Sequence, residues 1–219
     1  MSAFFEPLLL YMVLFFPGFA ANSIHLNEAA AAIIPFSSTR ELNRIIVYIL
    51  PTLAFLWYMI LKKNSLVLFP GELRFKLKDL YCFIWGFSGL ILIGMGISFI
   101  ITHTFPGSAS SKIQAPDNII GWIVLAFSCL GTGYLEESFF RFYLLLKLEE
   151  VIPYRIPKII FTTLLFALSH AYEGPWGVLN AAFAGLLLSL LFERYRSLHG
   201  IAIAHAFYNA FVYVMGNFI

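Results

Sequence analysis

Long apolar runs follow one another along the whole chain, and they exclude most soluble folds. Apolar residues make up 60% of the 219 residues and charged residues only 12%, whereas a soluble domain carries about 25% charged residues. A helix of about 20 apolar residues pairs its backbone polar groups internally and is long enough to cross a bilayer. The sequence therefore predicts an all-α, polytopic transmembrane helix bundle.

Seven apolar segments are candidates for the spans of this bundle. They cover residues 4–21, 45–61, 80–101, 119–146, 158–171, 176–192 and 198–216. Pro17-Gly18 interrupts the first segment, which is therefore either a span or a partly inserted segment. The third segment contains four glycines that would allow close helix approach, namely Gly86, Gly89, Gly94 and Gly96. Neither an internal repeat nor a soluble segment divides the chain, so residues 1–219 are predicted to form a single integral membrane domain of about seven spans.

Lysine and arginine are distributed unevenly between the predicted loops. The loops after the second, fourth and sixth segments hold Lys62, Lys63, Arg74, Lys76, Lys78, Lys147, Arg155, Lys158, Arg194 and Arg196. The other loops hold only Arg40, Arg44 and Lys112. Cytoplasmic loops carry the excess of basic residues, so the even-numbered loops are predicted to be cytoplasmic. The net charge of +2, without a long basic run, excludes nucleic acid as a partner and leaves the lipid bilayer and a membrane-associated protein or peptide.

The stretch GTGYLEESFFRFY, residues 131–143, places charges inside the fourth apolar segment. Each charge near a bilayer centre costs roughly 2.5 to 3.5 kcal/mol on insertion scales, so Glu136, Glu137 and Arg141 indicate a functional site. Glu137 and Arg141 are spaced i, i+4, the favourable order for a helical ion pair. We expect this pair to neutralise charge and hold the helix, which leaves Glu136 free to act. The sequence leaves open which glutamate faces a cavity.

Polar residues on two later segments are candidate partners for Glu136. His170 ends the apolar stretch FTTLLFALSH, and His205 lies in the last segment with Asn209 one helical turn later. Counted at about 1.5 Å per residue from the predicted cytoplasmic ends, these groups and Glu136 lie roughly 10 to 18 Å deep. Intramembrane polar residues are tolerated when they share a cavity, so we expect a polar catalytic cavity between the late helices.

Such a cavity is suited to the activation of water. A carboxylate between apolar walls can act as a general base, and a neighbouring histidine can orient the same water. A second histidine with an amide one turn away could bind a developing oxyanion. Two histidines and a glutamate could instead bind zinc, but the sequence lacks HExxH, and Cys82 and Cys129 have no metal-ligand spacing. We therefore expect no metal and no other cofactor, with zinc as the less favoured alternative.

Three short motifs in this region resemble those of the CPBP family, which includes type II CAAX-prenyl endopeptidases and the bacterial Abi and bacteriocin-processing proteins. Residues 136–141 match the EExxFR motif, residues 166–170 match FxxxH, and residues 205–209 match HxxxN. The resemblance covers a core of about residues 119–214. Phe142 departs from it, because many members have glycine after the arginine, and we expect this to alter local packing more than mechanism.

The resemblance implies a fold, an activity and a set of residue roles. It implies an intramembrane endopeptidase of the glutamic type, with Glu136 and His170 as the water-activating pair. His205 and Asn209 become the oxyanion site, with Glu137 and Arg141 in support. The implied substrate is a prenylated CAAX-like C-terminus, a leader peptide or a membrane-anchored sorting signal. The compact length and the lack of eukaryotic targeting features favour a multi-pass protein of a prokaryotic inner or plasma membrane.

Non-catalytic functions remain alternatives at the level of the sequence. An immunity or scaffold protein of the same fold could keep the same motifs. A proton-coupled transporter also uses intramembrane glutamate, histidine and arginine, but transporters often show internal repeats, and this chain has none. Glu136, His170 and His205 could also be a buried polar network that only fixes the register of the helices.

Overall fold

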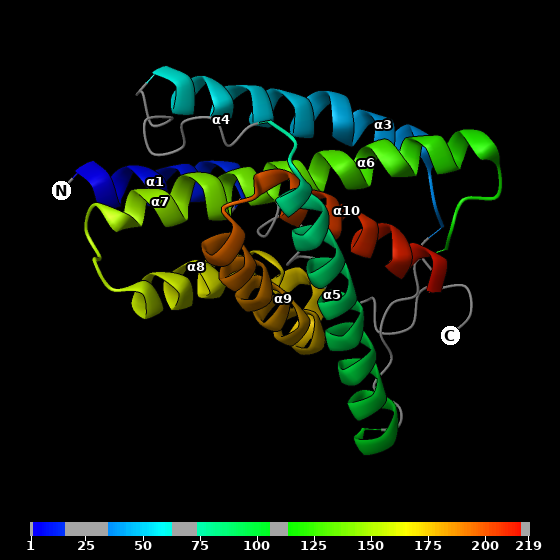
Figure 1. The fold of residues 1–219 in the computed structure, drawn as a ribbon. Helices are drawn as coiled ribbons and strands as arrows, with labels where there is room; N and C mark the ends of the chain where they lie inside the picture. The colour runs from blue at the N-terminus through cyan, green and yellow to red at the C-terminus, as the bar shows by residue number, and fades with distance from the viewer. Residues whose placement is uncertain (1, 16–34, 63–73, 106–113, 216–219) are drawn as a thin grey trace.

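The computed structural model describes residues 2–15, 35–62, 74–105 and 114–215, and within these ranges the chain is helical and contains no strand. In chain order the helices are α1 (Ser2–Leu14), α3 (Ser38–Arg44), η1 (Ile45–Ile49), α4 (Leu50–Lys62), α5 (Leu77–Thr104), α6 (Ile119–Glu137), η3 (Ser138–Leu144), α7 (Leu145–Glu149), α8 (Arg155–Ser169), η4 (Ala171–Glu173), α9 (Gly174–Tyr195) and α10 (Leu198–Met215). Figure 1 shows them packed as one bundle. The predicted all-helical class is confirmed.

Within the described ranges, five continuous helices are long and apolar enough to cross a bilayer. They are Ser38–Lys62, Leu77–Thr104, Ile119–Glu149, Ala171–Tyr195 and Leu198–Met215. The other two predicted spans correspond to the shorter helices α1, of 13 residues, and α8, of 15 residues. At about 1.5 Å per residue these reach only about 20 Å, against a hydrocarbon core of about 30 Å. The count of about seven spans is therefore not confirmed, although a multi-pass membrane protein is.

Helix α1 packs against the middle of the bundle along one face. Its residues Tyr11 and Phe15 are buried, and the Phe15 ring centroid lies 4.9 Å from those of Phe139 and of Phe140. The Tyr11 hydroxyl donates a hydrogen bond of 3.1 Å to the carbonyl of Leu165 on α8. These contacts place the end of α1 beside η3. Residues 16–21 of the first predicted segment lie outside the described ranges.

The segments α3-η1-α4 and α6-η3-α7 run side by side in the same direction (Figure 1). Glu41 near the start of the first contacts Ser128 of the second, and Trp57 further along lies 5.4 Å from Phe142 between ring centroids. Each contains a π-helical stretch, η1 in one and η3 in the other. Such insertions in α-helices are rare and occur frequently at functional sites.

Glycines bring α5, α9 and α10 into close contact. A Cβ on Gly86 would lie 2.9 Å from the Cβ of Ala204 on α10, and a Cβ on Gly89 would lie 2.6 Å from Leu187 on α9. A Cβ on Gly94 would meet the hydroxyl of Tyr208. Nothing lies within 4 Å of the same position on Gly96. Close approach is therefore confirmed at three of the four predicted glycines.

Ion pairs join several helix ends at the predicted cytoplasmic side. Lys158 of α8 lies 2.6 Å from Glu149 and 3.3 Å from Glu193, and Arg196 lies 3.1 Å from Glu149 and 3.4 Å from Glu193. Lys78 at the start of α5 donates to the carbonyl of Arg196 at 3.1 Å. Lys78, Lys158 and Arg196, three of the basic residues that the sequence assigned to even-numbered loops, thus lie close together.

Candidate active site

The charged stretch lies where α6 passes into η3. Glu136 and Glu137 are the last two residues of α6, and all seven residues of η3, from Ser138 to Leu144, are buried. The backbone N–H of Leu145 bonds to the carbonyl of Phe140, five residues earlier, as the π-helical geometry requires. The two glutamates therefore stand at a local change of helix type in the centre of the bundle.

Glu137 and Arg141 form the ion pair that their spacing predicts. Arg141 Nη1 lies 3.0 Å from Glu137 Oε1, and both side chains are almost completely buried. Arg141 Nη2 also donates to the carbonyl of Gly185 on α9 at 3.1 Å, and its guanidinium carbon lies 4.3 Å from the centroid of the Phe166 ring. A Cβ on Gly185 would lie 3.3 Å from this nitrogen, so the glycine leaves room for the arginine. The pair links η3 to α9 and α8.

His205 lies between the two glutamates. Its Nδ1 is 2.8 Å from Glu137 Oε1, and its Nε2 is 3.8 Å from Glu136 Oε2. Since Glu137 is a carboxylate paired with Arg141, it can only accept a hydrogen bond, and Nδ1 is therefore the donor. This bond fixes the ring and directs Nε2 toward Glu136. Glu137 thus orients His205, as second carboxylates orient histidines in other sites.

Glu136 differs from its neighbour in exposure and in partners. Its side chain is 16% exposed, whereas that of Glu137 is fully buried. Its Oε2 has no hydrogen-bond partner among the described residues, although this atom itself is buried. A buried acceptor without a partner is costly and is uncommon in folded proteins. Glu137 Oε2 also lacks a hydrogen-bond partner, but Glu137 Oε1 contacts both Arg141 and His205. The geometry therefore separates a fully buried Glu137 that is held by two partners from a partly exposed Glu136 that makes no hydrogen bond among the described residues.

His170 is joined to this group through an aromatic ring. It follows the last residue of α8, and its Nδ1 is 2.8 Å from the carbonyl of Phe166. The Phe166 ring centroid lies 4.6 Å from that of His170 and 5.9 Å from that of His205. No hydrogen bond between His170 and Glu136 occurs in the part of the chain that the structure describes. Glu136, Glu137, Arg141 and His205 are thus in direct contact, and His170 flanks them.

Asn209 lies one turn beyond His205 on α10 and is partly exposed. Among the described residues it makes no hydrogen bond, so its amide is also available. Its neighbour Tyr208 is held on two sides. The Tyr208 hydroxyl donates to Asn180 Oδ1 of α9 at 3.2 Å, and Gly94 of α5 approaches the same hydroxyl.

Asn180 is a residue that the sequence reasoning missed. It is an amide within the apolar segment 176–192, and a polar residue in such a segment usually has a polar partner. That pattern could have identified it. His199, near the start of α10, also has a partner, because its Nδ1 lies 2.9 Å from the Tyr134 hydroxyl.

No group of three or more His, Cys, Asp and Glu side chains within the described ranges is arranged to hold a metal ion. His205 already uses Nδ1 on Glu137, and His170 uses Nδ1 on a backbone carbonyl. Cys82 and Cys129 are both free and buried in separate helices. Among the described side chains, the zinc alternative therefore has no preformed group of three ligands of the kind a catalytic zinc ion uses.

Comparison with known proteins agrees with the motifs. The family model described as type II CAAX prenyl endopeptidase Rce1-like matches residues 118–211, which run from the start of α6 into the last turns of α10. A search of curated proteins and a search of solved structures each found no match. The matched segment contains Glu136, Glu137, Arg141, His170, His205 and Asn209. The match over residues 118–211 supports the CPBP family of CAAX-type proteases that the three motifs predict.

Proposed function

We propose that this protein is an intramembrane endopeptidase of the glutamic type, which hydrolyses a peptide bond of a membrane-associated protein or peptide. The observation that carries the proposal is the unpartnered Oε2 of Glu136, 3.8 Å from a histidine that a buried ion pair holds in place. The Rce1-like match supports a prenylated CAAX-like C-terminus as the first substrate class to test. A leader peptide and a membrane-anchored sorting signal are the other two.

In the proposed reaction Glu136 acts as general base and His170 orients the attacking water. Glu136 takes one proton from the water, and the hydroxide oxygen forms a bond to the carbonyl carbon of the scissile peptide. The resulting oxyanion accepts hydrogen bonds from the Asn209 amide and from Nε2–H of His205, which carries a proton on both ring nitrogens in this step. Glu136 then gives its proton to the leaving nitrogen as the C–N bond breaks, which returns the carboxylate to its starting state. Water is consumed, and a carboxylic acid and an amine are released, between which a proton then passes in water.

Glu137 and Arg141 act through His205 in this scheme. Their ion pair lies on the Nδ1 side of the ring, away from the space beside Glu136. A histidine held at one nitrogen presents the other with a fixed direction, which reduces the reorganisation needed in the transition state. Both residues are therefore proposed as positioning residues.

The proposal includes no metal. It relies on the carboxylate and on fixed hydrogen-bond donors for the charge stabilisation that zinc supplies in metalloproteases. Zinc remains the alternative for the same residues, and exhaustive chelation distinguishes the two. We place the protein in a prokaryotic inner or plasma membrane, which is likewise a proposal.

A non-catalytic immunity or scaffold protein is the second candidate. The observation that favours it is the closed network of Glu137, Arg141, Gly185 and His205, which ties η3, α9 and α10 together whether or not a reaction occurs. Such a protein would need this network for stability and would not need Glu136.

Cleavage by purified protein tests the proposal. Wild type, Glu136→Gln and Glu150→Gln are incubated in lipid vesicles with a farnesylated CAAX peptide, a leader peptide and a sorting-signal peptide, each with and without chelator. Glu150 is the matched control, because it is an exposed glutamate at the end of α7 that pairs with Lys147 at 2.6 Å. We expect chelator-insensitive cleavage that Glu136→Gln abolishes and Glu150→Gln retains. Cleavage that persists in Glu136→Gln, or that chelation removes, would overturn the glutamic mechanism.

A further inference from the structure

Four helix ends meet in one cluster of charged side chains, away from the residues of the three motifs. The start of α5, the end of α7, the start of α8 and the end of α9 contribute, in this order, Lys78, Glu149, Arg155 and Arg196. Glu149 lies 3.1 Å from Arg196, and Lys78 donates to the carbonyl of Arg196 at 3.1 Å. Helix ends leave backbone groups unpaired, which the hydrocarbon region of a bilayer does not tolerate. We therefore place this cluster at the level of the lipid headgroups.

Basic side chains outnumber carboxylates in the cluster. Lys158 is its fourth basic residue and Glu193 its second carboxylate. Glu193 contacts three of the four basic residues, namely Lys158 at 3.3 Å, Arg196 at 3.4 Å and Arg155 at 3.7 Å. Even when the fully buried carboxylate of Asp79 on α5 is counted, positive charge remains in excess. An anion at this position would therefore be attracted by the cluster as a whole.

Arg155 is the member of the cluster that can reach such an anion. Its side chain is 55% exposed, whereas those of Glu193 and Lys158 are only 7% exposed. Among the described residues, Arg155 contacts Glu193 through Nε at 3.7 Å and makes no hydrogen bond. Its two terminal nitrogens are therefore available, and a guanidinium can bind a phosphate through two parallel hydrogen bonds.

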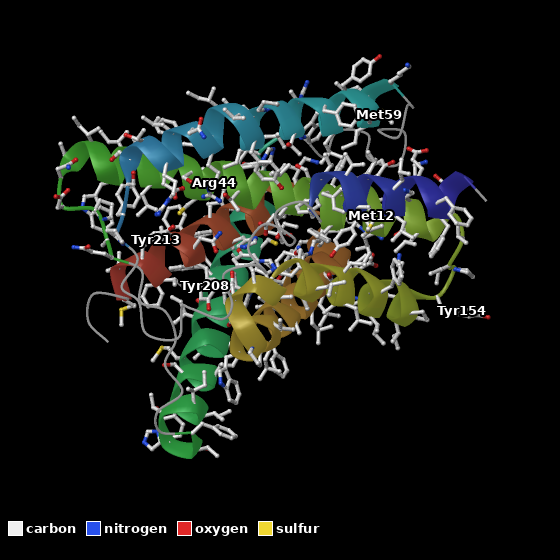
Figure 2. All side chains as sticks on the ribbon, turned by 180° about the vertical axis from the view of Figure 1, so that it is seen from behind. Met12, Arg44, Met59, Tyr154, Tyr208 and Tyr213 are labelled. Atoms are coloured by element: carbon white, nitrogen blue, oxygen red, sulfur yellow. The ribbon has the colours of Figure 1, made fainter. Side chains whose placement is uncertain are left out.

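Exposed apolar side chains flank Arg155 and continue along α8. Tyr154 and Ile156 are both largely exposed, and Figure 2 shows Tyr154 extending away from the bundle. Tyrosine is enriched at the interface between membrane and water. From Ile156 onward, side chains that are at least half exposed recur at intervals of four residues, namely Ile160, Leu164 and Leu168. Because this spacing places them on one face, α8 presents a guanidinium at its start and an apolar stripe along its length.

We propose that the start of α8 binds an anionic phospholipid, whose phosphate pairs with Arg155 and whose acyl chain lies along the apolar stripe. The stripe favours a lipid over a soluble phosphate, because a small anion gains nothing from apolar contact. The bound lipid stabilises the helix that ends beside His170. The inference is independent of the proposed endopeptidase function, since it concerns binding at a separate site.

Native mass spectrometry of the full chain in detergent measures the affinity for added lipids. The probes are phosphatidylglycerol, which is anionic, and phosphatidylcholine, which carries a phosphate but no net charge. Glycerol 3-phosphate, which has the phosphate without acyl chains, is added as a competitor. We expect wild type to bind phosphatidylglycerol roughly 10-fold or more tightly than phosphatidylcholine, without displacement by glycerol 3-phosphate. Arg155→Gln should weaken phosphatidylglycerol binding about 5-fold and leave phosphatidylcholine binding unchanged.

Arg194→Gln is the matched control. Arg194 is an exposed arginine directly after Glu193, and it makes no ion pair within the described residues. The substitution changes the net charge as Arg155→Gln does, yet it should keep the affinity of wild type. Arg155→Lys keeps the charge without the planar fork, so its affinity for phosphatidylglycerol should lie between those of wild type and Arg155→Gln.

Thermal unfolding in the presence of each lipid is the second measurement. Phosphatidylglycerol should raise the melting temperature of wild type more than that of Arg155→Gln, because a ligand stabilises the folded state that binds it. The same experiment shows whether each variant is folded. If Arg155→Gln does not fold, Arg155→Lys carries the comparison with wild type.

Three results would overturn the inference. Wild type could bind the two lipids with equal affinity, or Arg155→Gln could keep the full preference for phosphatidylglycerol. Equal losses in Arg155→Gln and Arg194→Gln would show a response to net charge without a site at α8. Displacement of phosphatidylglycerol by an equal concentration of glycerol 3-phosphate would assign the site to a free phosphate and overturn the lipid assignment. Cleavage is not measured in any of these experiments, so failure of the endopeptidase proposal would leave the result unchanged.

Discussion

The two sides of the α6–η3 junction differ in how completely their polar groups are paired. On the inner side, Glu137 and Arg141 bond to each other, to His205 and to the Gly185 carbonyl. On the outer side, Glu136 has an oxygen without a partner in the described structure, and Asn209 makes no hydrogen bond there. Glu137 Oε2 and Arg141 Nε also lack a partner, but both side chains are held by the bonds named above. Removing one member of such a buried ion pair is strongly destabilising, whereas a partly exposed carboxylate without a hydrogen bond is suited to a ligand. Adjacent residues in one sequence motif thus serve structure and chemistry separately.

The largest effect on stability is expected on the inner side. Arg141→Ala leaves the Glu137 carboxylate buried without its ion-pair partner and should lower the free energy of unfolding by about 3 to 5 kcal/mol. Thermal or denaturant unfolding in detergent micelles measures it. Glu137→Gln/Arg141→Met removes both charges and should be less destabilising than Arg141→Ala alone. Equal stability of Arg141→Ala and wild type would show that the pair does not hold the bundle.

The next largest effect is expected on the outer side of the junction. Here a substitution should lower activity and leave stability close to that of wild type. Asn209→Ala removes one proposed oxyanion donor and should lower kcat by about 10²- to 10³-fold. The melting temperature should stay close to that of wild type, because Asn209 makes no hydrogen bond within the described residues. Steady-state cleavage and unfolding are measured on the same preparation. A stability loss that accounts for the lost activity would place Asn209 on the structural side of the comparison.

The close packing of α6 against α10 can be tested with substitutions at two glycines. A Cβ on Gly133 would lie 2.6 Å from the carbonyl oxygen of Ala202 on α10, whereas a Cβ on Gly96 meets nothing within 4 Å. Gly133→Ala should therefore cost about 1 to 3 kcal/mol by forcing α6 away from α10. Gly96→Ala should be neutral or slightly stabilising. If both substitutions have the same effect on unfolding, close α6–α10 contact is not required.

The smallest expected effect concerns Tyr208, the residue before Asn209 on α10. Tyr208→Phe removes the hydrogen bond to Asn180 and keeps the ring, so it should cost about 0.5 to 1.5 kcal/mol of stability. Asn180→Ala should cost a similar amount, and the double variant little more than either one, because the two groups share one bond. Additive losses would mean that each residue has a separate partner.

Much of the site was predictable because it depends on spacing along single helices. The i, i+4 distance between Glu137 and Arg141 brings them together whether the turn is α- or π-helical. The spacing of His205 and Asn209 likewise follows from one helix. The orientation of Glu136 relative to Glu137 was not predictable, because it depends on the π-helical stretch η3 and on how α9 and α10 pack around it.

The number of spans was less predictable for a related reason. Residues 158–171 are apolar, but α8 ends at Ser169 and the chain turns through η4 before Gly174 and Pro175. Hydropathy measures composition and does not report where a helix stops. The contact between Glu41 and Ser128 also could not be foreseen, because these residues lie 87 positions apart.

The central claim is that Glu136 performs chemistry and Glu137 does not. The most direct measurement is the cleavage rate of a farnesylated CAAX peptide by wild type, Glu136→Gln and Glu137→Gln, each normalised to the folded fraction from thermal unfolding. We predict that Glu136→Gln folds like wild type and loses about 10²- to 10⁴-fold in rate, while Glu137→Gln is destabilised and its folded fraction retains more activity. A folded Glu136→Gln protein that cleaves at the wild-type rate would contradict the claim.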